Sequence, residues 1–275
     1  MTPRVALTVA GSDSGGGAGI QADLKTFSAF GVFGTSALTA VTAQNTLGVT
    51  GVLDIDPEFV VAQVEAVVGD LAPAATKTGM LARPDTVAAV GRLAASGVLG
   101  PVVVDPVLIS TSGSILMGPG GVDAYRAHLI PFADILTPNV TEAAALTGRD
   151  PSTVTTVEEM TEMAEELRAL GARVVVVKGG HLSRSGGSPD VVAGPRRVTV
   201  LPARRVPTTN DHGTGCSLSA AIAAALALGT QPEPAVARAK HFVLAALAGA
   251  RTWTLGAGRG PIDHFGWEPP TGPST

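Results

Sequence analysis

Short runs of β-branched residues alternate with longer segments of helical periodicity along most of this chain. Continuous valine runs are typical of strands buried on both faces, and strands that alternate with helices favour a parallel sheet. The sequence therefore predicts an α/β fold whose mainly parallel central sheet is covered by helices on both faces. The expected strands are residues 5–9, 36–43, 74–78, 102–104, 135–137, 174–177, 191–193 and 198–201, and the expected helices are residues 18–30, 57–68, 84–95, 122–129, 141–146, 157–170, 216–228 and 234–250.

The length and composition narrow the class of protein. At 275 residues the chain fits a single α/β domain, residues 1–275, with an extended glycine- and proline-rich tail at 257–275. The net charge is −4 without a basic stripe, so we expect no nucleic-acid partner. The apolar block 218–228 is shorter than the roughly 20 residues of a membrane span, which predicts no membrane association. A single cysteine fits a reducing compartment, so the expected location is the cytoplasm.

Polar residues follow the expected strands, at the edge of the sheet where open parallel sheets bind ligands. If the strands are parallel, these side chains converge on one rim. They are Ser12, Asp13, Gln44, Asn45, Thr78, Asp105, Asn139, Glu142, Lys178 and residues 213–216.

The segment from Asn210 to Cys216 leads directly into an apolar helix and has the composition of an anion cradle. Two glycines flank Thr214 there, so backbone N–H groups can converge at the positive end of the helix. We expect a phosphate group to bind at this point. Cys216 occupies the last position of the cradle, where a helix N-terminus is expected to lower the thiol pKa from its usual value of about 8.5.

Asp105, Asn139 and Glu142 carry the oxygen ligands that Mg²⁺ prefers, directly or through water. A purely structural interpretation also exists, in which Asp105 ends a strand and Asn139 caps the helix that contains Glu142. Lys178 ends another strand and is either a phosphate contact or a solvated lysine.

Two histidines, His181 and His212, flank the same rim. They are candidates for general bases or for polar loop residues, and neither has an aspartate partner at a fixed spacing.

A glycine-rich loop, residues 11–19, follows the first strand, and residues 17–22 fit the loose dinucleotide pattern G-x-G-x-x-A. The acidic residue expected about 20 positions later is replaced by Gln44 and Asn45, which disfavours a nicotinamide oxidoreductase. A simple turn remains an alternative. The favoured interpretation is a loop that folds over a small substrate.

Together these segments resemble the hydroxymethylpyrimidine/phosphomethylpyrimidine kinases of thiamine biosynthesis, which belong to the ribokinase-like superfamily. The resemblance rests on residues 10–26, 42–46, 77–81, 104–107, 137–143, 178–181 and 212–216. It implies a three-layer α/β/α sandwich, the use of ATP and Mg²⁺, a homodimer, and a pyrimidine alcohol and its monophosphate as acceptors.

The resemblance also implies roles for individual residues. Gln44 would hydrogen-bond the aminopyrimidine edge, in a pocket shaped by Gly11, Ala18, Asp23, Met80 and Val107. The phosphoryl group would lie in an anion hole formed by Gly213, Thr214, Gly215 and Cys216. Lys178 and Thr214 would contact nucleotide phosphates, and Asn139 with Glu142 would hold hydrated Mg²⁺. Cys216 stands where many relatives in the superfamily carry an aspartate base.

Two positions depart from the family pattern. Thr111 stands where many relatives have lysine, and Asp211 stands where threonine is common, which adds negative charge beside the anion hole. The alternatives left open are a pyridoxal kinase of the same subgroup and a noncatalytic pyrimidine-binding protein.

Overall fold

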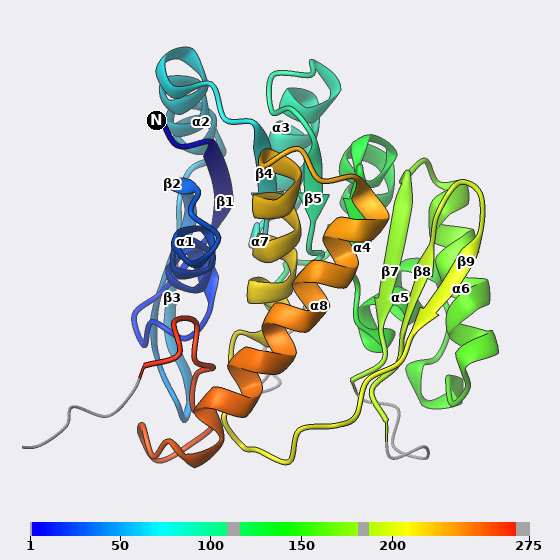
Figure 1. Ribbon diagram of the computed structural model, residues 1–275. Helices are drawn as coiled ribbons and strands as arrows, with labels where there is room; N and C mark the ends of the chain where they lie inside the picture. Colours follow the sequence, from blue (N-terminus) through cyan, green and yellow to red (C-terminus); the bar gives the residue numbers. More distant parts are fainter. Residues whose placement is uncertain (1, 109–115, 181–186, 268–275) are drawn as a thin grey trace, which may run out of the picture.

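The computed structural model describes residues 2–108, 116–180 and 187–267 (Figure 1). Thr111 and His181 therefore lie outside the described residues. The described residues form one sheet with the strand order β3-β2-β1-β4-β5-β6-β7-β8-β9. Its strands are β1 Val5–Asp13, β2 Phe33–Asn45, β3 Gly48–Asp54, β4 Ala75–Thr78, β5 Val102–Val104, β6 Ile135–Leu136, β7 Val174–Lys178, β8 Asp190–Ala193 and β9 Val198–Leu201.

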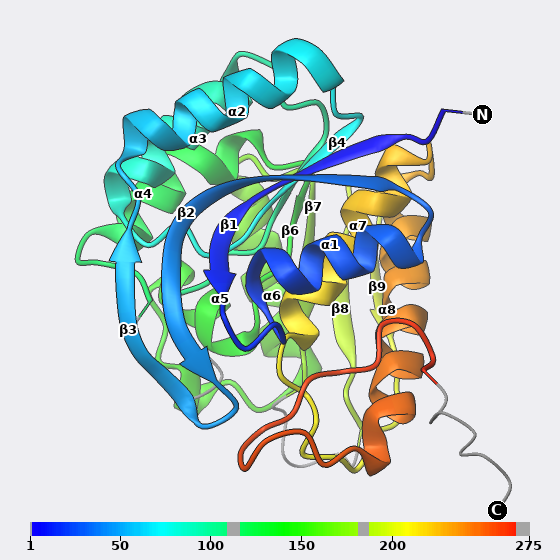
Figure 2. The same ribbon diagram turned by 90° about the vertical axis from the view of Figure 1, so that its left-hand side faces the viewer.

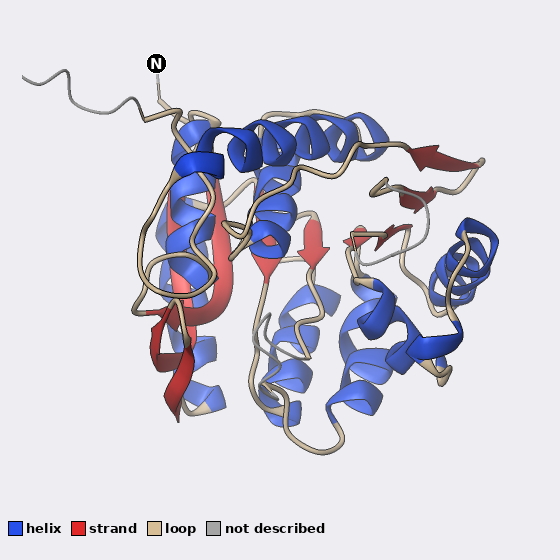
Figure 3. Ribbon diagram, turned by 90° about the horizontal axis from the view of Figure 1, so that it is seen from below, coloured by secondary structure: helices blue, strands red, loops and turns tan. Residues whose placement is uncertain are grey.

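The strands from β2 to β7 pair in parallel, whereas β3, β8 and β9 pair antiparallel at the two edges. The predicted α/β fold with a mainly parallel sheet is therefore confirmed. The sheet lies between two layers of helices (Figure 3). One layer contains α1 Gly19–Ala29, α7 Thr214–Ala227 and α8 Pro232–Gly249, and the other contains α2 Pro57–Leu71, α3 Pro84–Ala95, α4 Gly121–Ala124, α5 Val140–Thr147 and α6 Val157–Ala169.

The valine runs explain why both faces of the sheet are covered. In β5, Val102 and Val104 join the core under α2, α3 and α6, while Val103 joins the core under α1, α7 and α8. Successive side chains of a strand point to opposite faces, so a continuous apolar run buries both.

Three expectations differ from the structure. Strand β3 was not predicted, because its residues lie at the sheet edge and are mostly half-buried or exposed, without a clear alternation. The expected helix 122–129 is α-helical only through Ala124, and continues as a π-helical and then a 3₁₀ segment that contains Pro131. The described part of the tail, residues 257–267, consists of bends and irregular loop rather than an extended segment, and it is packed, with Ile262 and His264 buried.

Within the described residues, no helix is both long and apolar enough to cross a membrane.

Candidate active site

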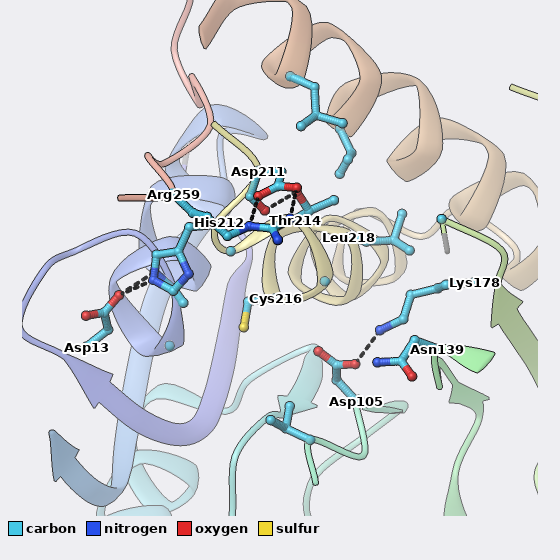
Figure 4. Close-up of a pocket in the computed structure, with 18 of the residues that line it drawn as sticks. Asp13, Asp105, Asn139, Lys178, Asp211, His212, Thr214, Cys216, Leu218 and Arg259 are labelled. Carbon is cyan, nitrogen blue, oxygen red and sulfur yellow. Dashed lines mark hydrogen bonds and ion pairs between the residues drawn. The ribbon is translucent and has the colours of Figure 1, made fainter. Parts of the chain in front are cut away.

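A cavity of about 410 Å³ lies beyond the carboxyl ends of the parallel strands. Most of the predicted rim lines it, and Figure 4 shows several of these side chains around one space. Thr78 and Asn45 are not among the lining residues. The rim residues that line the cavity are Ser12, Asp13, Gln44, Asp105, Asn139, Glu142, Lys178, Gly213, Thr214, Gly215 and Cys216.

The N-terminus of α7 has the geometry of an anion site. Gly213 precedes the helix with φ +82°, and a Cβ there would lie 1.8 Å from the Gly17 carbonyl oxygen, so only glycine fits. The Thr214 N–H and Oγ1 both donate to the Asp211 carbonyl oxygen, at 3.2 and 2.6 Å. In the described part of the chain, the N–H groups of Gly215 and Cys216 have no backbone acceptor, and they lie at the positive end of the helix.

Lys178 and Asp105 form an ion pair beside this helix terminus. The Lys178 Nζ lies 2.9 Å from Asp105 Oδ1 (Figure 4). A Cβ built on Gly215 would lie 3.3 Å from that Nζ, so the glycine leaves no side chain between the helix terminus and the ammonium. Burial opposes the charge, but the carboxylates of Asp105 and Glu142 outweigh it and raise the pKa of Lys178. The structure therefore presents a charged ammonium next to two helix amides.

Asn139 and Glu142 form a capping box that begins α5. The Asn139 N–H donates to Glu142 Oε2 at 2.8 Å, and the Glu142 N–H donates to Asn139 Oδ1 at 2.9 Å. Burial, with a smaller contribution from the Asp105 charge, raises the pKa of Glu142 to about 7 against the opposing effect of Lys178. The structural interpretation of Asn139 is thus confirmed, and both side chains also line the cavity.

The donor set suits a hydrated magnesium ion rather than a cage of protein ligands. Among the described residues no cluster of three or more histidine, cysteine, aspartate or glutamate side chains could hold a metal. Asp105 and Glu142 nevertheless bring two carboxylates to one wall. Mg²⁺ usually keeps several waters and binds one or two carboxylates together with substrate phosphates, so these residues fit it.

The expectation that the helix terminus lowers the pKa of the Cys216 thiol is wrong. Burial raises that pKa to about 11, although the charge of Lys77 opposes the shift. A thiol that loses water around its charged form titrates higher, and here this cost exceeds the help from the helix and the ammonium. The free thiol is therefore protonated at neutral pH.

On the opposite side of the cavity, Gln44 is the next-to-last residue of β2 and lies beside His212. The Gln44 Nε2 lies 3.2 Å from His212 Nε2, and the Thr42 Oγ1 donates to Gln44 Oε1 at 3.2 Å. His212 Nε2 also lies 2.9 Å from Asp13 Oδ2 (Figure 4). The His212 and Asp13 pair is a site feature that the sequence did not reveal, because the two residues are 199 positions apart.

Asp13 also organises the glycine-rich loop. Its Oδ2 accepts hydrogen bonds from the N–H groups of Gly17 at 3.1 Å and Ala18 at 2.8 Å, and its Oδ1 accepts from Gly15 at 2.8 Å. Burial opposes ionisation of this carboxyl, but the hydrogen bonds from His212 and the backbone lower its pKa. An ionised Asp13 therefore holds the loop against the cavity.

The residues expected around the pyrimidine divide into two groups. Gly11, Ala18, Met80 and Val107 line the cavity, and a Cβ on Gly11 would lie 2.3 Å from Met80 Cε. Asp23 does not line the cavity. It is fully buried between α1 and the sheet, where it pairs with Lys77 at 2.8 Å, so a direct role in the pocket wall is corrected to a position behind it.

The remaining wall was not predicted from the sequence. It combines apolar side chains of α7 and α8 with basic residues, and its only sequence signal is the apolar face at 243, 244 and 247 of the expected last helix. These lining residues are Leu218, Val243, Leu244, Leu247, Val206, Pro207, Arg204, Arg205, Lys240 and Arg259.

Comparison with known proteins gives consistent matches over nearly the whole chain. Residues 13–263 match the family model for phosphomethylpyrimidine kinase. The hydroxymethylpyrimidine/phosphomethylpyrimidine kinase of Rhizobium meliloti is 50% identical over 264 residues, which cover 95% of this chain and 97% of that protein.

Solved structures of two kinds resemble this fold. The pyridoxal kinase from Staphylococcus aureus in complex with AMP-PCP and pyridoxal superposes with a TM-score of 0.87 at 32% identity, covering 97% of this chain and 95% of that one. The phosphomethylpyrimidine kinase from Clostridium difficile 630 has a TM-score of 0.77 at 40% identity, covering 89% and 99%.

Proposed function

Because this chain belongs to the phosphomethylpyrimidine kinase family, we propose that it phosphorylates 4-amino-5-hydroxymethyl-2-methylpyrimidine and then the resulting monophosphate, for thiamine biosynthesis, with ATP as donor. The observation that carries the proposal is the set of residues that line the cavity. One side presents the Gln44 amide, and the other presents the α7 terminus with Lys178. A pyrimidine and a transferring phosphoryl group would each find a matching partner there.

Recognition of the pyrimidine rests on Gln44. Its amide offers one acceptor and two donors, which suits a ring nitrogen next to an exocyclic amine. Thr42 donates a hydrogen bond to the amide oxygen, and the amide nitrogen lies next to the His212 ring. Met80 and Val107 supply apolar contacts for the ring.

Phosphoryl transfer depends mainly on positioning and on donors aimed at the phosphoryl oxygens. The N–H groups of Gly215 and Cys216 would contact these oxygens. Lys178 would keep one N–H donor on Asp105 and direct another toward the nucleotide phosphates. Asp105 and Glu142, near Asn139, would hold Mg²⁺ through water, and the ion would supply positive charge against the phosphate groups. Thr214 fixes the cradle through its two hydrogen bonds to Asp211.

The proton balance leaves a role for Cys216. The acceptor hydroxyl oxygen forms a bond to the terminal phosphorus, the bond to the ADP oxygen breaks, and the hydroxyl proton must leave. Cys216 lines the cavity beside the cradle, so the small fraction of its thiol that is ionised at neutral pH is our candidate acceptor of that proton. The monophosphate is largely ionised at neutral pH, since its second pKa is about 6, and it needs no such base.

The nucleotide base would occupy the apolar wall formed by Leu218, Val243, Leu244 and Leu247. The S. aureus relative was solved with AMP-PCP, which supports ATP as the donor.

A homodimer is also proposed. Val52 and Leu53 of β3, Leu47 in the preceding turn and Phe59 at the start of α2 are exposed apolar side chains. They lie on and beside the edge strand that curves along one side of the sheet (Figure 2). A second copy that covered this edge would remove both the apolar surface and the unpaired strand.

The single free cysteine supports a cytoplasmic location.

A pyridoxal kinase is the second candidate, favoured by the TM-score of 0.87 to the S. aureus enzyme. ADP release should be measured with ATP, Mg²⁺ and three acceptors in parallel: the pyrimidine alcohol, its monophosphate and pyridoxal. We expect the highest kcat/KM for the two pyrimidines, and Gln44→Leu should weaken their use about 10²-fold while ATP binding changes little. Preferred use of pyridoxal, or no ADP release with any acceptor, would contradict the proposal.

A further inference from the structure

The C-terminal strap, residues 256–264, joins the two halves of the site. The Arg259 N–H donates to the Thr46 carbonyl oxygen at 3.0 Å, and the Gly258 N–H donates to Thr46 Oγ1 at 3.2 Å. The next residue, Gly260, accepts a hydrogen bond from the His212 N–H at 3.0 Å. The strap therefore connects the turn after Gln44 to the loop before the anion cradle.

The fit of the strap is close. A Cβ on Gly258 would lie 2.0 Å from the Thr46 carbonyl oxygen, and one on Gly260 would lie 2.0 Å from Asn210 Oδ1. Further along, the buried His264 Nε2 lies 2.9 Å from the Ser217 Oγ on α7. The glycines of this segment thus serve close backbone contacts, which hold the strap in one place.

Arg259 is the strap residue that reaches the cavity. Its Nε donates to Asp211 Oδ1 at 2.7 Å, and a second guanidinium nitrogen pairs with Asp211 Oδ2 (Figure 4). Such a two-point contact fixes both position and orientation. The same Asp211 offers its carbonyl oxygen to Thr214, so the pair is connected directly to the first residue of α7.

The charge of Asp211 would otherwise oppose the function of the cradle. Asp211 and Thr214 both line the cavity, where a nucleotide phosphate would bring further negative charge. Like charges repel, and the Asp211 carboxylate, which is 28% exposed, would act on the phosphates through partly solvated space. The guanidinium of Arg259 pairs with both Asp211 oxygens and so offsets this negative charge.

We propose that Arg259 is a positioning residue for nucleotide phosphates, which acts by neutralising Asp211 and by fixing the cradle loop to the strap. The proposal rests on the proposed kinase function. It assigns to the Arg259 side chain a part in ATP affinity and none in recognition of the pyrimidine.

The test is a double-mutant cycle at Arg259 and Asp211, which changes the charge at each position. Arg259→Ala should raise KM for ATP about tenfold, because an unpaired carboxylate then faces the phosphates. Arg259→Ala combined with Asp211→Asn should return KM for ATP to within about threefold of the starting value. Asp211→Asn alone, which leaves the guanidinium next to the phosphates, should lower KM for ATP about twofold. KM for the pyrimidine should stay unchanged in all three variants.

Arg83→Ala is the matched control, because Arg83 also pairs with a nearby exposed aspartate, Asp85, but does not line the cavity. It should leave KM for ATP unchanged. A binding measurement gives a second reading of the same cycle, since Kd for AMP-PCP by calorimetry should follow the pattern of KM for ATP.

The chain has two tryptophans, Trp253 and Trp267, whose rings stack with centroids 6.0 Å apart at the ends of the strap. Their emission should be the same in the double variant and in the unmodified protein. Failure of Asp211→Asn to restore ATP affinity, with altered emission, would mean that Arg259 only packs the strap, and would overturn the proposal.

The two proposals fail in different ways. If AMP-PCP binding follows the double-mutant cycle but no acceptor is phosphorylated, the role of Arg259 stands and the proposed substrate is wrong. If the pyrimidines are phosphorylated and Arg259→Ala leaves KM for ATP unchanged, the kinase stands and the role of Arg259 is wrong.

Discussion

Two of the lysine and aspartate pairs near the carboxyl ends of the strands differ in their access to the cavity: Lys178 and Asp105 line it, whereas Lys77 and Asp23 do not. Lys77 on β4 pairs with Asp23 on α1 at 2.8 Å, and both side chains are completely buried. Lys178 on β7 pairs with Asp105, which follows β5, at 2.9 Å, and Lys178 is 15% exposed. The two ion pairs therefore have nearly equal N–O distances, but one is fully buried and the other borders the cavity.

The hydrogen bonds around the aspartates show what the difference means. Asp23 accepts from Lys77 at 3.0 and 2.8 Å and from the Thr8 Oγ1 at 2.6 Å, so its oxygens are occupied. Asp105 accepts one short hydrogen bond from Lys178, and its remaining side-chain contacts are 3.3 Å long. Lys178 can therefore share its three donors with a ligand, while Lys77 is committed to its partner. Access to the cavity, rather than the ion pair itself, distinguishes the pair that can bind a ligand from the pair that only stabilises the fold.

The largest expected effect is on stability, from Lys77→Met. It leaves the Asp23 carboxylate buried without its cation, which should lower the free energy of unfolding by about 3–5 kcal/mol. Urea denaturation measures this. Combining Lys77→Met with Asp23→Leu removes both charges and should recover most of the loss. Lys178→Met should cost much less, because Lys178 lines the cavity and water can replace its ammonium beside the buried Asp105; equal losses at the two lysines would break the comparison.

The next effect concerns Cys216, whose thiol pKa of about 11 is influenced by groups of both pairs. Below that pKa the thiolate fraction rises about tenfold for each pH unit. If the thiolate accepts the proton, kcat for the pyrimidine alcohol should rise between pH 7 and 9, and kcat for the monophosphate should rise much less. Cys216→Ala should remove the rise. Parallel pH profiles for the two acceptors would leave only the Cys216 backbone N–H in the mechanism.

A smaller effect is expected from Glu142→Gln. Glutamine keeps the capping box with Asn139 but removes the negative charge, so the fold should persist while the Mg²⁺ concentration for half-maximal activity rises about threefold to tenfold. The pKa of Glu142 is about 7, and protonation removes the same charge. The Mg²⁺ requirement of the unmodified protein should therefore increase as the pH falls below 7. A variant with the same Mg²⁺ dependence as the unmodified protein at pH 8 would exclude Glu142 from the metal site.

Much of the fold follows from the sequence, because the valine runs of β5 and β7 are buried on both faces and leave a clear pattern. Strand β3 could not be found in this way, since an exposed edge strand has no buried face to impose a pattern. The strand-end rule also predicted the rim, from Gln44 to Lys178, because it depends only on topology.

The rest of the site depends on distances that a linear pattern does not contain. The pair of His212 and Asp13 joins residues 199 positions apart. The pKa of Cys216 moved in the opposite direction to the expected one, because burial is a tertiary property. The position of Asp23 behind the cavity depends on which side of α1 faces the sheet. Its ion pair with Lys77 joins residues 54 positions apart, so the sequence pattern around Lys77 does not indicate it.

The most direct test of this account is kcat for the pyrimidine alcohol, measured as ADP release at saturating ATP and Mg²⁺, in two variants side by side. Lys178→Met should remain folded and lose about 10²- to 10³-fold in kcat, since a donor aimed at the phosphoryl group is gone. Lys77→Met combined with Asp23→Leu should keep kcat within about tenfold of the unmodified protein, because neither residue lines the cavity. A normal kcat in Lys178→Met, or an equal loss in both variants, would contradict the assignment of catalysis to the Lys178 and Asp105 wall.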